Sequence, residues 1–298
     1  MAVMIENGYS LPTPRRARIG WRDVIESISA TSAATHGPAS AALSWQTYER
    51  WRPTASPATL TATFDEQTIE YVGIAAHTLR TADSVAIEVR EGGAWSEIMP
   101  DLVSWPEDNE AIMLLLEPRE IDGVRLVVEY SGDAPTVGKV AAGKVMTMER
   151  PFYGGHSPGL LSRDTRRQPS VSEGGEWLGN TVIRQGRSTS MTWEHIPANW
   201  YRINVDPFIQ HARGKPFFIA WNPLRFTDCL YAMLTADAAP SNMGIRDLMS
   251  FTLDIKGYSD GTQPWLSRFS RDVIDVYPDI GQNASIIDFA INDEWPES

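Results

Sequence analysis

Short runs of alternating apolar residues, separated by turn signals, fill residues 43–150 and constrain the fold more than any other feature. The runs "ATLTATF", "TIEYVGIAAHTL", "EAIMLLLEP" and "VRLVVEYSG" have the length and composition of strands, with "DEQ" read as a turn after the first. "TADSVAIEVREGGAWSEIM" predicts a hairpin that turns at "EGG". No amphipathic helix of about ten residues interrupts these runs. This spacing is typical of a jelly-roll-like β-sandwich.

The run from Thr68 to Leu79 is apolar at nearly every position. It predicts a central strand covered on both faces. Side-chain alternation places Ile69, Tyr71 and Gly73 on one face, and Val72, Ile74 and Ala76 on the other. His77 falls where this strand ends. Its imidazole either bonds to a backbone carbonyl or marks a binding site in the adjacent loop.

Residues 181–260 predict a second, smaller unit that combines strands with one short helix. "NTVIRQGRSTSMTWEHI" has the composition of a long hairpin. Asp206 suits the N-cap of a helix, Pro207 its first position and Gly214 the position past its end. The strands "KPFFIAW", "DCLYAMLTAD" and "LMSFTLDIKGY" follow, the last with Phe251, Leu253 and Ile255 alternating. This order predicts a small barrel or a curled sheet.

The chain is therefore expected to be mainly β, with an α+β second domain. The predicted divisions are an extended N-terminal arm (1–42), a β-sandwich (43–150), a linker rich in Gly, Ser, Pro and Arg (151–180), a barrel (181–260) and a C-terminal tail that docks on neighbours (261–298). The arm serves either as a linker or as a segment that lies on a neighbouring subunit.

Overall charge and cysteine content restrict the partners of the chain. Asp and Glu number 38 against 26 Lys and Arg, a formal net charge of −12. Such a chain is poorly suited to binding nucleic acid, because neutralising phosphates needs clustered cations. A single cysteine allows no intramolecular disulfide, which fits folding in a reducing cytoplasm. No apolar segment has the roughly 18 residues of a membrane span. The first 21 residues have no apolar run after their charges, so we expect no secretory signal.

No motif in the sequence indicates catalysis, a cofactor or a metal. The patterns of nucleophile elbows, zinc proteases, phosphate loops and paired cysteines do not occur. Five histidines are scattered without ligand spacing, and the acidic turns resemble solvated turns more than a calcium site. We therefore expect a protein that is not an enzyme, although a hydrolytic pair among the 38 acids would leave no sequence signature.

Two groups of residues are candidates for binding. Trp95 and Trp105, with His77 as a hydrogen-bond donor, are candidate glycan contacts, because a sugar packs its C–H face on an aromatic ring. Packing in the core is the competing interpretation for each tryptophan. Arg184, Arg187 and Trp193 lie on the expected second-domain hairpin. They are the candidate subunit interface, where one copy would continue the sheet of the next.

Two segments resemble minor tail and distal tail-tip proteins of long-tailed bacteriophages. Trp45–Leu79 resembles a galactose-binding-like sandwich, and Gly186–Pro223 resembles the tail-tube-like barrel of ring-forming tail proteins. The order here is sandwich first and barrel second, whereas many distal tail proteins begin with the ring domain.

The resemblance implies a structural, non-enzymatic component of a virion tail tip or baseplate. It would form a ring of three to six copies at the end of the tail tube, through which DNA passes, and would fold in the host cytoplasm. Its other partners would be tube, hub and fibre proteins, with a role in host attachment. The alternative is a carbohydrate-binding protein that recognises a host cell-surface glycan.

Overall fold

The computed structural model describes residues 2–99, 111–151, 154–158, 161–225, 227–244 and 246–259. The chain divides into two compact units, Met1–Gly261 and Thr262–Ser298, and all described residues belong to the first. The expected C-terminal tail (261–298) therefore lies outside the described residues. Strands predominate in the described part, which confirms the mainly β class.

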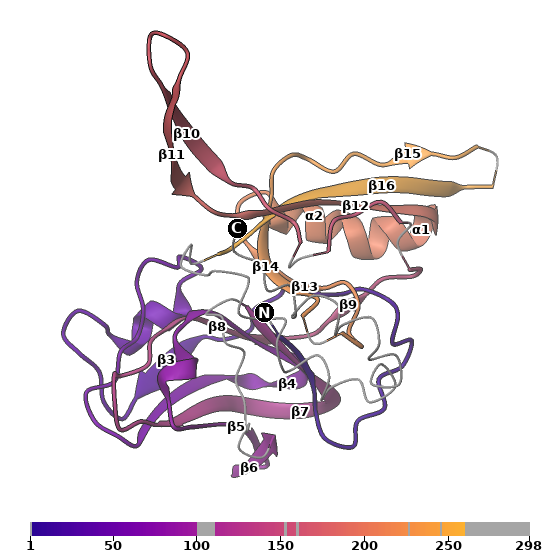
Figure 1. Cartoon of the computed structure of the whole chain (residues 1–298). Helices are drawn as coiled ribbons and strands as arrows, with labels where there is room; N and C mark the ends of the chain where they lie inside the picture. Colours follow the sequence, from indigo (N-terminus) through magenta and orange to yellow (C-terminus); the bar gives the residue numbers. More distant parts are fainter. Residues whose placement is uncertain are drawn as a thin grey trace, which may run out of the picture. The chain divides into compact units, whose positions relative to one another are not determined.

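The first sheet has seven strands and follows the path β3-β4-β7-β5-β6, with β1 parallel to β7 and β8 antiparallel to β4 (Figure 1). Its strands are β1 (Ala2–Ile5), β3 (Ser27–Ala30), β4 (Ala58–His77), β5 (Ser84–Glu91), β6 (Ala94–Met99), β7 (Ile112–Glu129) and β8 (Val137–Gly143). Two short 3-10 helices, η1 (Ala39–Leu43) and η2 (Leu79–Thr81), lie between strands.

Strands β4 and β7 run through both layers of a sandwich. Their first and last parts pair with different neighbours: β3 and β5 join one half, and β1 and β8 join the other. The register between β4 and β7 shifts at Thr63/Gln67 and again at Ile69/Tyr71. Such irregularities bend a strand without ending it. The turn expected at "DEQ" is therefore wrong, as is the division of β7 into two strands.

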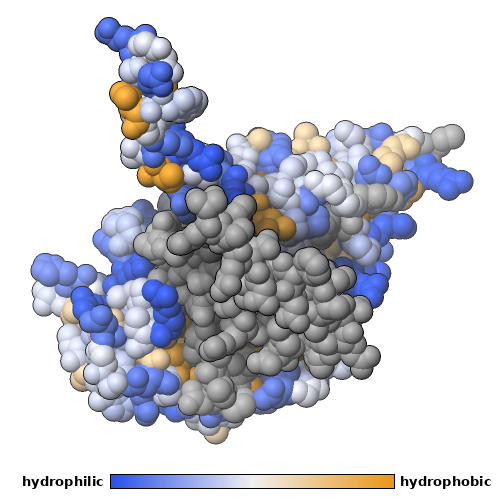
Figure 2. Space-filling model, viewed as in Figure 1, coloured by the Kyte–Doolittle hydropathy of each residue, from blue (hydrophilic) through white to orange (hydrophobic). Residues whose placement is uncertain are grey.

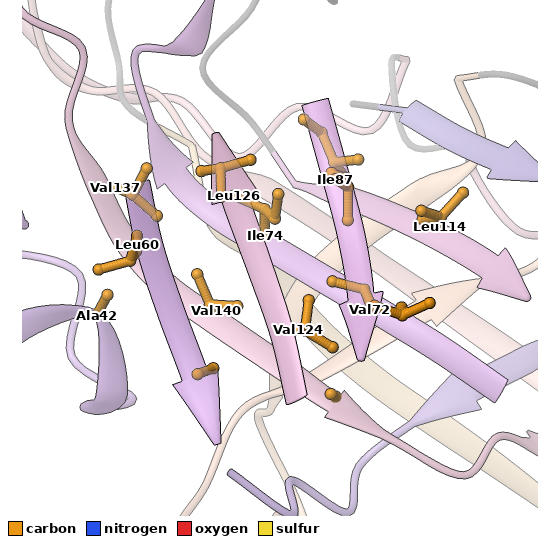
Figure 3. Close-up of a cluster of buried hydrophobic side chains, with 14 of the residues drawn as sticks. Ala42, Leu60, Val72, Ile74, Ile87, Leu114, Val124, Leu126, Val137 and Val140 are labelled. Atoms are coloured by element: carbon orange, nitrogen blue, oxygen red, sulfur yellow. The ribbon is translucent and has the colours of Figure 1, made fainter. Parts of the chain in front are cut away.

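A cluster of aliphatic side chains fills the space between these two layers (Figure 3). Leu60, Val124 and Leu126 come from one half, and they pack with Val72 and Ile74 of the other. This core confirms the predicted sandwich. The hairpin β5–β6 is also confirmed, with Gly92 and Gly93 at positive φ in its turn.

The second sheet also has seven strands and follows the path β12-β16-β14-β13-β2-β9, with β15 beside β16. They are β2 (Arg18–Gly20), β9 (Met146–Thr147), β12 (Arg187–Pro197), β13 (Phe217–Ala220), β14 (Cys229–Leu234), β15 (Ser241–Asn242) and β16 (Leu248–Gly257). Among the strands that the structure describes, β9 and β12 at the two ends do not pair, so the sheet is open. Of the two expected forms, barrel and curled sheet, the barrel is therefore absent from the described residues, and the open sheet takes β2 and β9 from outside residues 181–260.

One continuous helical segment covers this sheet. It comprises α1 (Ala198–Trp200), a π-helical turn η3 (Tyr201–Val205) and α2 (Asp206–Ala212). Asp206 lies inside the segment with helical φ and ψ, so its expected role as N-cap is wrong. Helical hydrogen bonding already begins after Pro197. Phe208, Ile209 and Ala212 are buried as expected.

Two further clusters show how these elements stack. Phe218 and Tyr231 of the second sheet pack against Tyr71, Met113 and Ala141 on the outer face of the sandwich. The other face of the second sheet packs against the helical segment, with Trp193, Phe217, Phe251 and Leu253 meeting Tyr201 and Phe208. The described residues therefore form four layers: two halves of the sandwich, the second sheet and the helix.

The segments expected as arm and linker contain regular structure. Strands β1 and β3 of the arm join the first sheet and β2 joins the second, so this segment is not irregular. Within the expected linker, β10 (Arg166–Val171) begins a two-stranded ribbon that β11 (Trp177–Arg184) completes (Figure 1). The expected hairpin of residues 181–196 is wrong, because β11 pairs with β10 while β12 pairs with β16.

Candidate binding cleft

A cleft of about 210 Å³ lies where the sandwich meets the second sheet. Six parts of the chain form its walls: the end of β2 with the segment after it, the end of η1 with the residues after it, strand β4, strand β8, the stretch from the end of α2 to β13, and strand β14. They contribute Gly20, Trp21, Asp23, Ile25, Leu43, Trp45, Tyr71, Lys139, Ala141, His211, Lys215, Pro216, Phe218 and Tyr231. Aromatic rings and charged groups therefore share one small cavity.

Two tryptophans supply aromatic surface to the cleft. The ring of Trp21 meets the ring of His211 edge to face, with 5.2 Å between centroids, and the Arg22 guanidinium lies 4.5 Å from the Trp21 ring centre. Trp45 is 45% exposed, a large fraction for a tryptophan. The Tyr231 hydroxyl donates to the Trp45 backbone oxygen at 3.0 Å. The backbone of Trp45 is thus fixed while much of its ring faces solvent.

An ion pair lies in the wall of the cleft. The Lys139 ammonium is 2.6 Å from an Asp23 carboxylate oxygen and donates to the Leu43 backbone oxygen at 2.8 Å. The other Asp23 carboxylate oxygen accepts from the backbone N–H groups of Ile25 (3.2 Å) and Ala142 (3.4 Å). Only 7% of the Lys139 side chain is exposed, against 28% for Asp23. This ion pair connects strand β8 to the segment that follows β2.

Two tyrosines and a histidine complete the polar lining. Tyr71 donates to the Arg22 backbone oxygen at 3.2 Å, and burial raises the pKa of its phenol, as it does for Tyr231. Burial, together with the positive charges of Lys215 and Arg22, lowers the pKa of His211. His211 is therefore neutral near pH 7, and both phenols keep their protons. Each of these groups can take part in hydrogen bonds without an added charge.

His77, expected as a candidate glycan contact, lies elsewhere. It ends β4 and is 0% exposed, and its Nδ1 accepts from the Leu79 backbone N–H at 3.3 Å. His77 does lie at the end of a strand, as the first of the two interpretations expected. In this hydrogen bond, however, a backbone N–H donates to the ring, whereas the interpretation expected the ring to donate to a backbone carbonyl. A fully buried ring cannot contact a glycan at the surface, so that part of the prediction is wrong.

Trp95 lies on the outer face of the hairpin β5–β6 and is half-buried. The Arg125 guanidinium is 4.5 Å from its ring centre and that of Arg90 is 5.5 Å away, while the ring extends over Gly123. Both arginines are themselves paired, Arg90 with Asp122 and Arg125 with Glu88. The ring is thus engaged by arginines and does not line the cleft. Trp105 lies outside the described residues.

The three expected interface residues do not share one surface. Arg184 is exposed and pairs with Asp164 at 3.0 Å, and Arg187 begins β12. Trp193 is 0% exposed and stacks on Phe251 with 5.3 Å between ring centroids. It is therefore a core residue and not part of an interface, because its position on β12 faces the helical segment.

Sequence reasoning missed most of the cleft. In the sequence, Trp45 stands out only as the start of the sandwich-like segment Trp45–Leu79, and Trp21, Asp23, Lys139 and His211 belong to no motif. Asp23 and Lys139 are 116 residues apart in the sequence, and no spacing pattern links them.

In the described ranges, no group of three or more His, Cys, Asp or Glu side chains is arranged to hold a metal ion. None of the described helices is long and apolar enough to cross a membrane.

Comparisons with known proteins identify β-sandwich modules among solved structures. A pectin-binding carbohydrate-binding module shares 16% identity and a TM-score of 0.36, covering 41% of this chain and 93% of that one. Chitosan-binding module 1 of a Paenibacillus sp. IK-5 chitosanase/glucanase gives 16% and 0.37, over 41% and 99%. The family 32 module of C. perfringens NanJ, solved with galactose, gives 15% and 0.36, over 42% and 98%.

These likenesses are too remote to support an argument about function, since the TM-scores of the three structures are all below 0.5. No family model and no curated protein matches the chain. The three structures named above are carbohydrate-binding modules and not tail proteins, so the resemblance to tail proteins stays a prediction. The function of this chain must therefore be inferred from its cleft and from the surface of the described residues.

Proposed function

We propose that the chain is a non-enzymatic binding protein whose cleft takes one sugar unit at the end or side of a glycan. The observation that carries this proposal is Trp45, a tryptophan with 45% of its surface exposed on the wall of a cleft that also holds charged groups. A sugar presents apolar C–H faces and polar hydroxyls, and it needs both kinds of partner.

The dimensions and chemistry of the cleft agree with such a ligand. Its volume of about 210 Å³ is below the roughly 300–1,000 Å³ of pockets that bind drug-sized ligands, which favours one ring over a long oligomer. Asp23 can accept from hydroxyl groups, Lys215 can donate to them, and neutral His211 can do either. Trp21 and Trp45 provide the aromatic surface.

Replacing Trp45 tests this function. We expect Trp45→Ala to weaken glycan binding up to about tenfold, because an aromatic ring contact contributes roughly 0.5–1.5 kcal/mol and 1.4 kcal/mol is a factor of ten. Binding would be measured by calorimetry with the best ligand from a glycan array. Tyr48→Ala is the matched control, since Tyr48 is 74% exposed, lies three residues further along and does not line the cleft. An array without any ligand, or equal binding by Trp45→Ala and wild type, would contradict the proposal.

A second candidate function is that of a structural subunit that assembles with other copies, as the tail resemblance implies. One observation favours it: the ribbon of β10 and β11 exposes apolar side chains that an isolated chain would not keep in water. The two candidates are compatible, since a glycan-binding subunit can also belong to an assembly. Light scattering on the purified protein separates a monomer from an assembly.

A further inference from the structure

The β10–β11 ribbon stands apart from both sheets and is exposed along its whole length (Figure 1). Every residue of its two strands is exposed. Its large apolar side chains are exposed to between 47% and 77%, and Figure 2 shows apolar residues on its surface. They are Val171, Trp177, Leu178, Val182 and Ile183. No other strand pair among the described residues exposes so many.

Such a ribbon needs a partner for energetic reasons. A two-stranded hairpin is marginally stable at best when nothing packs on it. Exposed apolar groups on open strand edges promote association with other chains, and proteins usually protect such edges with charge or cover. In β11 the apolar pairs Trp177–Leu178 and Val182–Ile183 stand on either side of Gly, Asn and Thr, so each face of the ribbon carries apolar side chains. The ribbon therefore has the properties of one side of a protein–protein interface.

The charge of the ribbon indicates which kind of surface would form the other side of this interface. Residues 163–187 carry five arginines against three acids, a net charge of +2, whereas the whole chain carries −12. Arg166 and Arg167 are exposed, and neither forms an ion pair within the described part of the chain. Arg167 lies directly opposite Val182 in the ribbon, so an unpaired cation adjoins an apolar side chain. Tryptophan and arginine are the residue types that contribute most at protein interfaces.

We infer that this ribbon docks on a second copy of the chain, against an acidic surface outside residues 163–187. The inference deepens the second candidate function and rests on it, but it does not depend on the cleft. Contact between two ribbons would bring like charges together, whereas contact between a ribbon and the remainder of another copy pairs opposite charges. Such a contact joins two different surfaces, so it generates a ring or a longer array.

The first test is the mass of the full chain by light scattering over a concentration series. Wild type is expected to exceed the monomer mass as concentration rises. Trp177→Ser with Leu178→Ser, and separately Arg166→Glu with Arg167→Glu, should weaken this association at least tenfold. The matched control is Ile203→Ser with Leu224→Ser, because these residues are 62% and 50% exposed but lie outside the ribbon. Unchanged circular dichroism would show that the ribbon variants still fold.

The outcomes separate the inference from the function on which it rests. Assembly that persists in both ribbon variants would overturn the ribbon contact while leaving assembly standing. A wild type that stays monomeric at every concentration would overturn both, whatever else the ribbon binds. Neither result bears on glycan binding by Trp45→Ala.

A cross-linking experiment identifies the contacting surface. Cys229 is the single cysteine of the chain and is buried, so a cysteine introduced as Leu178→Cys can be labelled selectively with a photoreactive maleimide. Illumination in the presence of unlabelled protein should join two copies through a peptide outside residues 163–187. Cross-links only within one chain, or only between two ribbons, would contradict the proposed contact.

Discussion

Gly73 shows how one residue sets the distance between two layers. It lies in the second half of β4, and a Cβ added there would meet the Phe218 ring at 2.6 Å. The ring of a buried β13 residue therefore rests directly on the backbone of the sandwich. The sequence predicted a covered strand here, but not which residue covers it. Ile69 was expected on the same face as Gly73. In the structure it joins Val72 and Ile74 in the inner cluster, because the register shift at Ile69/Tyr71 changes the alternation of side chains.

The first residue-scale prediction concerns this contact. Gly73→Ala should lower the free energy of unfolding by roughly 1–3 kcal/mol, because the added methyl group overpacks a closed interface. Urea denaturation monitored by tryptophan fluorescence measures the change. Gly132→Ala is the control, since a Cβ there meets nothing within 4 Å. Equal stability of the two variants would show that the layers separate easily.

A second residue-scale prediction concerns pH. Burial raises the pKa of Asp228 to about 6, against the opposing charge of Arg225 and hydrogen bonds from Trp221 and Thr227. The folded state therefore holds this proton more tightly than the unfolded state, whose Asp has a pKa of 3.8. The contribution of Asp228 to stability rises as pH falls from 7 through 6 toward 4, and is absent above about 7.

Replacing Asp228 by Asn should remove this dependence. We expect Asp228→Asn to be more stable than wild type at pH 8 by roughly 1–3 kcal/mol, with the advantage shrinking toward pH 5. Urea unfolding at the two pH values provides the comparison. An advantage that is the same at both would mean that the Asp228 carboxyl does not titrate in this range.

At the scale of elements, local signals were predictable and distant pairings were not. The hairpin β5–β6 follows from two adjacent glycines that permit positive φ, and β16 follows from its alternating residues. The strands β1, β2 and β3 have only three or four residues each and acquire strand geometry from partners far away in the sequence. The ribbon escaped prediction because its polar and glycine-rich ends resemble a linker. The cleft was not predicted because six separate segments of the chain meet there.

The element-scale prediction concerns the segment between β2 and β3, which the Asp23–Lys139 pair fastens to β8. Asp23→Ala should cost roughly 3 kcal/mol, since it leaves the more buried Lys139 ammonium without its anion. Lys139→Met should cost less, because Asp23 is more exposed and still accepts two backbone hydrogen bonds. Thermal and urea unfolding of both variants and the double variant give the comparison. A larger loss for Lys139→Met would contradict this account.

At the scale of the whole molecule, the three apolar clusters hold four layers together. Composition and strand spacing predicted a β-sandwich followed by a second sheet with one helix. They did not predict that strands from residues 2–30 would complete both sheets, so that the sandwich and the second sheet share chain segments as well as a packed face. The predicted boundaries at 42, 150 and 180 each fall between residues that pair with one another in the sheets.

The pairing of β2 with β13 has a consequence for synthesis in the cell. Gly20 pairs with Phe218, so β2 is made about 200 residues before β13, the strand that joins it to the rest of the second sheet. At about 5–20 residues per second, a ribosome needs roughly 10–40 s to cover that interval. Until β13 is made, Ala17 and Ile19, which are buried in the finished protein, can pair only with the two-residue strand β9. A nascent chain of this protein therefore presents a sustained target for chaperones that hold exposed apolar segments.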